Sequence, residues 1–364
     1  MNVYDIPIDK FKNSYERLSQ HVRDAGYTTS ISEKWSVFEY FSHILLHLTF
    51  LALAVLYQEN SLLFFGFMFL SAFPGIGITT TAHTASHYSL VKSRRLNDFF
   101  VYFGYGLLFG ASREYWMHKH VKVHHPNPNI VGIDEDIDLM PWFVMNRDDY
   151  DNASKLKKLY FRLQFLIIPF ALTLNLFNVQ KDGFIHLYRQ IRKRGVTKNI
   201  SIDLAIIFCH FILWLAVPSL FFDFTDVLLF YYIRAAFIGY GMFSAFAPAH
   251  FPDNTLFLPL KEKEMDFVIR QLYTTTNFKA GIIGKFILGG VQYQIEHHLF
   301  PNCHHYHYPK INLLLKKFCQ ENHLPYNEMG WLKGIWESLK VFYKPKKVQE
   351  LPVVLQAPRE KVLV

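Results

Sequence analysis

The sequence predicts an all-α integral membrane protein in which four transmembrane helices form two hairpins carrying a helical cytoplasmic cap. Its composition is apolar for a soluble protein, with 51% hydrophobic and only 19% charged residues. Four apolar runs, 41–57, 61–81, 202–222 and 226–247, approach the roughly 20 residues that cross a bilayer as a helix. The chain also has 18 histidines, and several of them cluster near the ends of these runs, which indicates a metal site in the cap.

The pairing of the runs follows from their connections. Only residues 58–60 separate the first two runs, and only residues 223–225 separate the last two. Connections this short join antiparallel helices, and neither contains Lys or Arg. The loops at 92–95, 113–122 and 189–198 are rich in both, so the positive-inside rule places these loops and both termini in the cytoplasm.

The rest of the chain divides around this membrane domain, which we assign to residues 39–335. Residues 1–38 are predicted to be a cytoplasmic lead-in with an amphipathic helix, because apolar side chains recur there every three or four residues, at Phe11, Tyr15, Leu18 and Val22. Residues 336–364 are predicted to be a flexible tail. The shorter apolar segments 99–111 and 160–178 are predicted to be interfacial or re-entrant, since a single crossing would misplace a basic loop.

Charge and cysteine content exclude several classes of function. The net charge is +8, but the basic residues alternate with long apolar runs, which favours an anionic membrane leaflet or an anionic substrate head over nucleic acid. The three cysteines, Cys209, Cys303 and Cys319, form no CxxC motif. Neither a disulfide framework nor a thiolate metal site is therefore predicted.

Three histidine motifs and one isolated histidine lie on the predicted cytoplasmic side. The first motif contains His83 and His87, an i,i+4 pair that shares one helix face. The third motif ends in the adjacent His297 and His298, which point about 100° apart on a helix and can therefore bind two different ions. In the second motif, this spacing predicts that His120 and His124 share a face and that His125 points to another position. Eight imidazoles exceed the four ligands of one tetrahedral zinc site, so two ions are predicted. The candidate ligands are His83, His87, His120, His124, His125, His250, His297 and His298.

The remaining histidines are given other roles. His43 and His47 lie near the end of the first run and are interpreted as interfacial, although a polar pair in a membrane is also a functional candidate. His118 is about 10 Å along the helix from His125, too far to bind the same ion. His210 is interpreted as a core histidine. Three histidines after the third motif are expected to be solvated or to support the ligands: His304, His305 and His307.

The three motifs resemble the histidine boxes of the integral-membrane fatty acid desaturase family. The segments are HTASH from His83, HVKVHHPNPNIVGIDEDID from His120 and GGVQYQIEHHLFP from Gly289, with RQLYTTTNF and HHYHYPKI nearby. Gln294 stands where a first histidine of the third box is usual, which resembles the front-end and linoleoyl-CoA desaturase-like branch. The resemblance implies two irons, O₂ and two electrons, and a cis double bond made in a long acyl chain. It also implies an extra ligand at the position of His250.

Further roles are implied by the same resemblance. The chain has no HPGG haem signature, so we expect no fused cytochrome b5 domain and a separate electron donor, a ferredoxin or a cytochrome b5-type protein. Trp116 and Phe278 are candidates for lining an acyl tunnel. Arg113 and the basic residues near it are candidates for holding a phosphate-bearing head group.

The sequence departs from the family pattern in the first box. Thr84 stands where an acidic residue usually follows the first histidine, and a carboxylate often orients a ligating histidine. Asp134 and Asp136 are candidates for this role. Imidazole suits iron, zinc, copper and nickel alike, so two alternatives stay open. One is a hydroxylase or ketolase on the same di-iron scaffold, and the other is a histidine-rich zinc membrane receptor or hydrolase.

Overall fold

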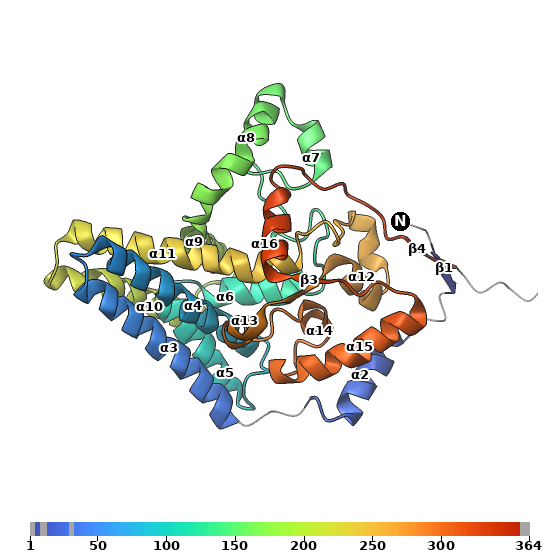
Figure 1. Cartoon of the computed structure of the whole chain (residues 1–364), viewed down its shortest axis with the longest axis horizontal. Helices are drawn as coiled ribbons and strands as arrows, with labels where there is room; N and C mark the ends of the chain where they lie inside the picture. Colours follow the sequence, from blue (N-terminus) through green and yellow to red (C-terminus); the bar gives the residue numbers. More distant parts are fainter. Residues whose placement is uncertain (1–3, 8–12, 29–32, 357–364) are drawn as a thin grey trace, which may run out of the picture.

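The computed structural model describes residues 4–7, 13–28 and 33–356. Figure 1 shows long helices side by side at one end of the molecule and a cap of shorter helices at the other. The long helices are α3 (Glu33–Leu56), α4 (Ser61–Ser86), α10 (Lys198–Phe211) and α11 (Phe224–Phe246). The fold is therefore all-α, as predicted, and the described residues add only two pairs of short strands.

Four helical segments are long and apolar enough to cross a membrane, which confirms the four predicted runs. They comprise 33–56, 61–86, 198–220 and 224–249, and the third continues from α10 through the π-helical turn η3 (Ile212–Ala216) and η4 (Pro218–Leu220). Each segment extends beyond its apolar run at the cap end. The second extends by five residues to Ser86, which places His83 inside the helix instead of after it.

The two helices of the first hairpin approach closely at glycine. A Cβ atom on Gly77 would lie 2.6 Å from the ring of His43, so only glycine allows this contact. His43 and His47 are fully buried there, and their rings bond to the carbonyl oxygens of Phe286 and Ser71. Both side chains are therefore enclosed by protein, and their interpretation as interfacial stays a prediction.

Two segments between the hairpins contact the bundle without being one straight span. Residues 94–108 form α5 (Arg94–Val101) and the π-helix η1 (Tyr102–Leu108). Helices α8 (Lys155–Leu172) and α9 (Asn175–Arg194) meet at a bend of 84°. By length and composition this bent pair fits a broken span or a re-entrant loop, and its prediction as interfacial or re-entrant stays open.

The cap encloses its own apolar core. Leu18 and Val22 of α2 (Ser14–Asp24) are buried in this core, which confirms the predicted amphipathic helix, while Phe11 lies outside the described residues. The other cap elements are α6 (Arg113–Trp116), η2 (Met117–His124), α7 (Arg147–Asn152), η5 (Ala247–Ala249), η6 (Leu260–Glu264), α12 (Phe267–Thr274), α13 (Gly281–Ile287), α14 (Gln294–Leu299), η7 (His305–His307), α15 (Tyr308–Asn322) and α16 (Trp331–Lys340).

The segment predicted as a flexible tail is largely folded onto the cap. After α16, Val341 and Phe342 are buried, and Lys346 is only 9% exposed. Two parallel strand pairs complete the structure, β2 (Asn277–Lys279) with β3 (Glu328–Gly330) and β1 (Tyr4–Pro7) with β4 (Val353–Gln356). The prediction from residue 336 failed because lysine and proline content indicates solvent exposure only when no distant partner covers the segment.

Candidate metal centre

Eight buried histidines form two adjacent groups at the cap end of the spans. In each group the ring nitrogens that could bind an ion lie within 4.8 Å of one another. The first group contains five residues, His83, His87, His120, His125 and His297, and the second contains three, His124, His250 and His298. All eight candidate ligands from the sequence therefore come together.

Four separate parts of the chain bring these side chains to one place. His83 lies in the last turn of α4, and His87 caps its end. The helix formed by α6 and η2 carries the second motif, His250 follows η5, and α14 carries His297 and His298. Because every element ends or turns at the base of the cap, histidines more than 200 residues apart share one buried site.

The distribution within the second motif differs from the prediction. We expected His120 and His124 to share a face, but His120 groups with His125, and His124 belongs to the other group. The reason is that Met117–His124 is a π-helix, in which the amide of His125 bonds to the carbonyl of His120. The wider turn brings the side chain of His125 close to that of His120, with ring centroids 4.6 Å apart, while the rings of His120 and His124 stay stacked at 5.3 Å. Such turns are frequent at functional sites.

The adjacent histidines of the third motif behave as their spacing predicts. His297 belongs to the first group and His298 to the second, and their rings are nearly perpendicular at 87°. The pair therefore bridges the two groups from one short helix.

Hydrogen bonds hold several rings so that Nε2 faces the centre. The Nδ1 atom of His298 lies 3.0 Å from Oε1 of Gln271, and that of His250 lies 3.3 Å from the carbonyl of Thr274. These oxygens accept only, so Nδ1 must carry the proton and Nε2 must carry the lone pair. In His298 that lone pair has no partner among the described residues, whereas in His250 it faces the side-chain amide of Gln294. The Nδ1 atoms of His297 and His124 are held by Tyr308 Oη and Asp134 Oδ2, each at 3.0 Å.

The spacing of the nitrogens fits a metal ion. The Nε2 atoms of His83 and His120 are 2.8 Å apart, and His125 Nε2 lies 3.1 Å from His120 Nε2 and 3.0 Å from His297 Nε2. Two imidazole nitrogens bound at right angles, each about 2.1 Å from one ion, would lie about 3.0 Å apart. Nε2 of both His87 and His298 is buried without a hydrogen-bond partner among the described residues. The donor set thus fits metal ions better than it fits a network of protein hydrogen bonds.

The electrostatic environment keeps most of these imidazoles neutral, the form that binds metal. Burial, followed by the charge of His124, lowers the pKa of His87 to about 3. Burial and neighbouring imidazoles also hold the pKa of His120, His125 and His297 well below the usual value. His124 is the exception: burial would lower its pKa, but the charge of Asp134 outweighs this effect and raises it.

Three polar residues from the motifs, Gln294, Asp134 and Asp136, lie beside the second group. The side-chain amide of Gln294 lies 3.0 Å from His250 Nε2, and its Oε1 is buried without a partner among the described residues. Asp134 accepts the backbone N–H of Asn129 as well as the proton of His124. Asp136 lies 3.4 Å from His124 Nδ1 and pairs with Lys119 at 2.9 Å. Both acidic candidates therefore lie beside a histidine of the second group.

Thr84 and Trp116, not acidic residues of the motifs, lie beside the first group. Thr84, which replaces the usual acidic residue, donates to the carbonyl oxygens of Thr80 and Gly289 and so ties α4 to the third motif. Trp116 stacks on His120 with centroids 4.4 Å apart, and its Nε1 donates to Ser86. The tunnel role of Trp116 stays a prediction, but its contact with a candidate ligand was not foreseen.

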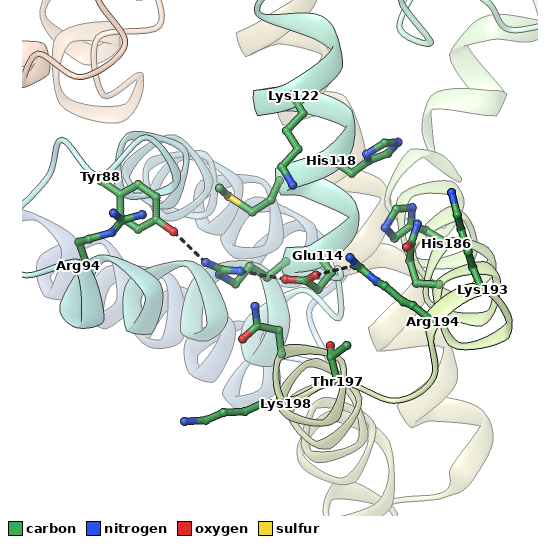
Figure 2. A pocket seen from close by; sticks show the side chains of 14 residues that line it. Tyr88, Arg94, Glu114, His118, Lys122, His186, Lys193, Arg194, Thr197 and Lys198 are labelled. Carbon is green, nitrogen blue, oxygen red and sulfur yellow. Dashed lines mark hydrogen bonds and ion pairs between the residues drawn. The ribbon is translucent and has the colours of Figure 1, made fainter.

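A basic cavity of about 810 Å³ lies beside the helix that carries the second motif (Figure 2). Its cationic lining residues are Arg94, Arg113, Lys122, Lys193, Arg194 and Lys198, against one carboxylate, Glu114. Arg113 bonds to Asp98 and Glu114, and Arg194 lies 3.7 Å from Glu114. The cavity therefore keeps an excess of positive charge even after these pairs are counted.

The other histidines lie outside the two groups. His118 stacks with His186 in the wall of the basic cavity. His210 bonds to the Leu107 carbonyl and the Tyr231 hydroxyl, as expected of a core histidine. His304 and His305 are buried, which excludes solvation for both; His304 bonds to Ser36. Phe278 is buried against Trp331.

Sequence reasoning missed several residues that hold the ligands. Gln271 also donates to the carbonyl of His125 at 2.9 Å, so it holds both groups. Glu296, between Ile295 and His297, is fully buried and bonds to Asn277 and Tyr326. Gln271 lies in RQLYTTTNF and Tyr308 in HHYHYPKI, but the letters of these segments do not reveal which atom faces which ligand.

Comparison with known proteins agrees with this geometry. Residues 59–330 match the model of the fatty acid desaturase family. The chain is 27% identical over 273 residues to the Delta(5) fatty acid desaturase fat-4 of Caenorhabditis elegans, covering 71% of this chain and 59% of that protein. It is 28% identical to the Delta(8)-fatty-acid desaturase of Euglena gracilis over 67% of this chain and 59% of that protein. The Delta(6)-fatty-acid desaturase fat-3 of C. elegans is 27% identical over 93% of this chain and 77% of that protein.

The chain thus spans about three fifths of the length of the first two of these relatives. The family match covers far more than half of the chain and includes every histidine of the two groups. Four candidate membrane spans and buried histidine groups accompany it. This chain belongs to the fatty acid desaturase family.

Proposed function

We propose that the protein is a membrane-bound non-haem di-iron acyl desaturase of the front-end type, which introduces a cis double bond into a long acyl chain. The observation that carries the proposal is the pair of adjacent, buried histidine groups at the end of four apolar helices. The Delta(5), Delta(6) and Delta(8) names of the relatives support the front-end assignment.

In this proposal the two groups hold one iron each. His83, His87, His120, His125 and His297 bind the first iron, and His124, His250 and His298 bind the second. Bound iron would supply the O₂-derived oxidant that an unactivated C–H bond requires. The partners at Nδ1, such as Gln271 and Tyr308, fix the ring orientations, and the buried surroundings exclude water from the reacting carbons.

The basic cavity would hold the head of the substrate. A phosphate-bearing acyl carrier matches its excess of Arg and Lys, which bind phosphate by charge and hydrogen bonds. Its wall includes Met117 and Lys122 of η2, the same helix that carries His120, so a head bound there would place its acyl chain near the metal groups.

The remaining partners follow from the reaction. Two electrons would come from a separate ferredoxin or cytochrome b5-type donor, and O₂ is the co-substrate. The distribution of Lys and Arg supports a cytoplasmic site, with both termini on the same side. The bilayer would deliver the acyl chain, because the spans expose apolar side chains such as Leu62 and Phe208.

Fatty acid profiling of a host that expresses the chain tests the activity. We expect a new unsaturated acid whose double bond lies between the carboxyl end and an existing double bond. The His297→Ala variant should lose this product, and the exposed His21→Ala variant should keep it. A hydroxylated product would instead assign the chain to a hydroxylase on the same scaffold.

Metal analysis of the purified protein tests the di-iron site independently. We expect about two irons per chain, which is one for each histidine group. Zinc in active protein would refute the proposal.

The phosphate-bearing carrier is tested by substitutions in the basic cavity. A Lys193→Gln and Lys198→Gln double variant should raise KM for a phosphate-bearing acyl substrate and leave kcat nearly unchanged. Lys333→Gln, outside the cavity lining, serves as the control.

A further inference from the structure

The segment after α16 is connected to the loop that carries His250. The backbone N–H of Lys346 donates to the Met145 carbonyl at 2.8 Å, and its carbonyl accepts from Arg147 at 2.7 Å. Three residues later, Gln349 N–H donates to the Phe257 carbonyl at 2.9 Å. These bonds hold the Lys346 backbone between two segments of the cap and determine where its side chain enters.

The ammonium group of Lys346 ends in a cage of oxygen atoms. It lies 2.6 Å from the carbonyl of Thr255, 2.8 Å from that of Pro252, 3.4 Å from that of Phe251 and 2.9 Å from Thr255 Oγ1. The ring of Phe257 lies 4.6 Å away. Among the described residues, no carboxylate lies within 4.0 Å of this group, and a buried lysine without a paired carboxylate is rare in proteins. Its neighbours instead resemble the oxygen ligands of a bound cation, with the loop 251–255 wrapped around it.

The hydrogen bonds of this cage continue to the backbone of His250, a candidate ligand. An ammonium group has no lone pair, so it donates to Thr255 Oγ1, and the proton of that hydroxyl is left for another acceptor. Two carbonyl oxygens lie within reach of this proton, that of His250 at 2.5 Å and that of Pro252 at 2.8 Å, and the His250 carbonyl is the nearer. The His250 carbonyl also accepts from Asn129 Nδ2 at 2.8 Å. Lys346, Thr255 and His250 thus form one continuous chain of hydrogen bonds.

We infer that Lys346 is a positioning residue for the second histidine group, acting through Thr255 on the backbone of His250. This inference rests on the proposed function, because it assumes that this group holds a metal ion. His250 lies just after the fourth span, in a turn that follows η5, and its backbone is not held by a regular helix. The histidines of the first group lie in or directly after α4, η2 and α14, and none of them lies in this turn.

The test compares Lys346→Met with Lys347→Met in the full-length, iron-loaded protein. Methionine keeps most of the length and apolar contact of lysine but cannot donate, and Lys347 is an exposed neighbour that serves as the matched control. We expect Lys346→Met to bind one of the two irons about 10- to 100-fold more weakly, the usual effect of losing a group that orients a ligand. Iron titration and the rate of iron release to a chelator measure this, with cobalt(II) as a spectroscopic probe of the remaining site.

A second variant separates positioning from general loss of structure. Thr255→Val removes only the hydroxyl, so it should weaken the same iron, and the Lys346→Met and Thr255→Val double variant should be no weaker than the more affected single variant. General destabilisation would instead release both irons together and add in the double variant. Unchanged affinity of both irons in Thr255→Val would overturn the inference, even if Lys346→Met failed to fold. A wild-type protein that bound fewer than two irons would refute the proposed function instead.

Discussion

A single buried carboxylate in the third span is predicted to set the position of the second histidine motif. Asp203 is fully buried in α10, and its oxygens accept from Ser112 Oγ at 2.6 Å and from the backbone N–H groups of Arg113 and Glu114 at 3.0 and 2.9 Å. These two N–H groups begin the helix that carries the second motif. They have no partner within that helix, and a negative charge there also interacts favourably with its dipole.

The magnitude follows from these three bonds. Hydrogen bonds to a charged group contribute about 1.5–3 kcal/mol each, and a buried donor left unpaired costs about 1–3 kcal/mol. Asp203→Asn keeps one acceptor oxygen, but its NH₂ group faces a donor, so we expect the free energy of unfolding to fall by about 2–3 kcal/mol. Asp203→Ala leaves all three donors unpaired, and we expect a loss of about 4–5 kcal/mol, at the upper end for a single substitution.

Thermal unfolding of the detergent-solubilised protein measures the loss, with iron content and product formation measured in parallel. Iron binding should fall in both variants, because the helix that begins at Arg113 carries His120, His124 and His125. Asp223→Asn, at an exposed position where the side chain caps nothing, is the control. If Asp203→Asn melted like this control and kept both irons, the helix would be positioned by its packing alone, and the reasoning would be refuted.

Three further predictions test the packing and the protonation of the described residues. Gly239→Ala should lower the melting temperature, because a Cβ atom would lie 2.3 Å from a backbone carbonyl, whereas Gly66→Ala meets open space and should not lower it. Burial lowers the pKa of His304 to about 2, so between pH 6.5 and pH 2 only the unfolded chain binds this proton. The free energy of unfolding should therefore decrease as the pH is lowered below 6.5, by up to about 1.4 kcal/mol per pH unit, and His304→Gln should flatten this dependence in a melting series. Burial raises the pKa of Cys303 and Cys319 to about 12, so a maleimide at pH 7.5 should label neither in the folded protein, and mass spectrometry that found either one modified would contradict their burial.

Local patterns in the sequence were sufficient to predict the spans and the candidate ligands. Hydropathy is a property of consecutive residues, so the run that became α4 could be recognised without knowing its neighbours. The spacing of His297 and His298 likewise predicted two directions from one helix, and the structure places them in different groups. The resemblance of the three motifs then indicated the family, which the match over residues 59–330 shows.

Such local patterns could not predict contacts between segments that are distant in the sequence. Thr84 was recognised as a departure, but its bond to the Gly289 carbonyl joins residues 205 positions apart. Lys346 was assigned to a flexible tail because its local sequence is basic and proline-rich, although its side chain is enclosed by oxygens from residues 251–255. A buried cation can be recognised only when the groups that replace its water are known.

The amino-acid sequence alone therefore specified which helices are long and apolar enough to cross a membrane and which histidines are candidate ligands, since both depend on residue type and short-range spacing. Folding in three dimensions decided how those histidines are shared. In the π-helical turn at Met117–His124 the hydrogen bonds span five residues instead of four, which brings His125 close to His120, and the ring nitrogen of His124 belongs to the other group. Asp203 bonds to the start of the helix that carries the second motif, Gln271 bonds to His298, and Lys346 bonds to Thr255, each from an element far away in the chain. No local pattern reports contacts that form only when those elements meet.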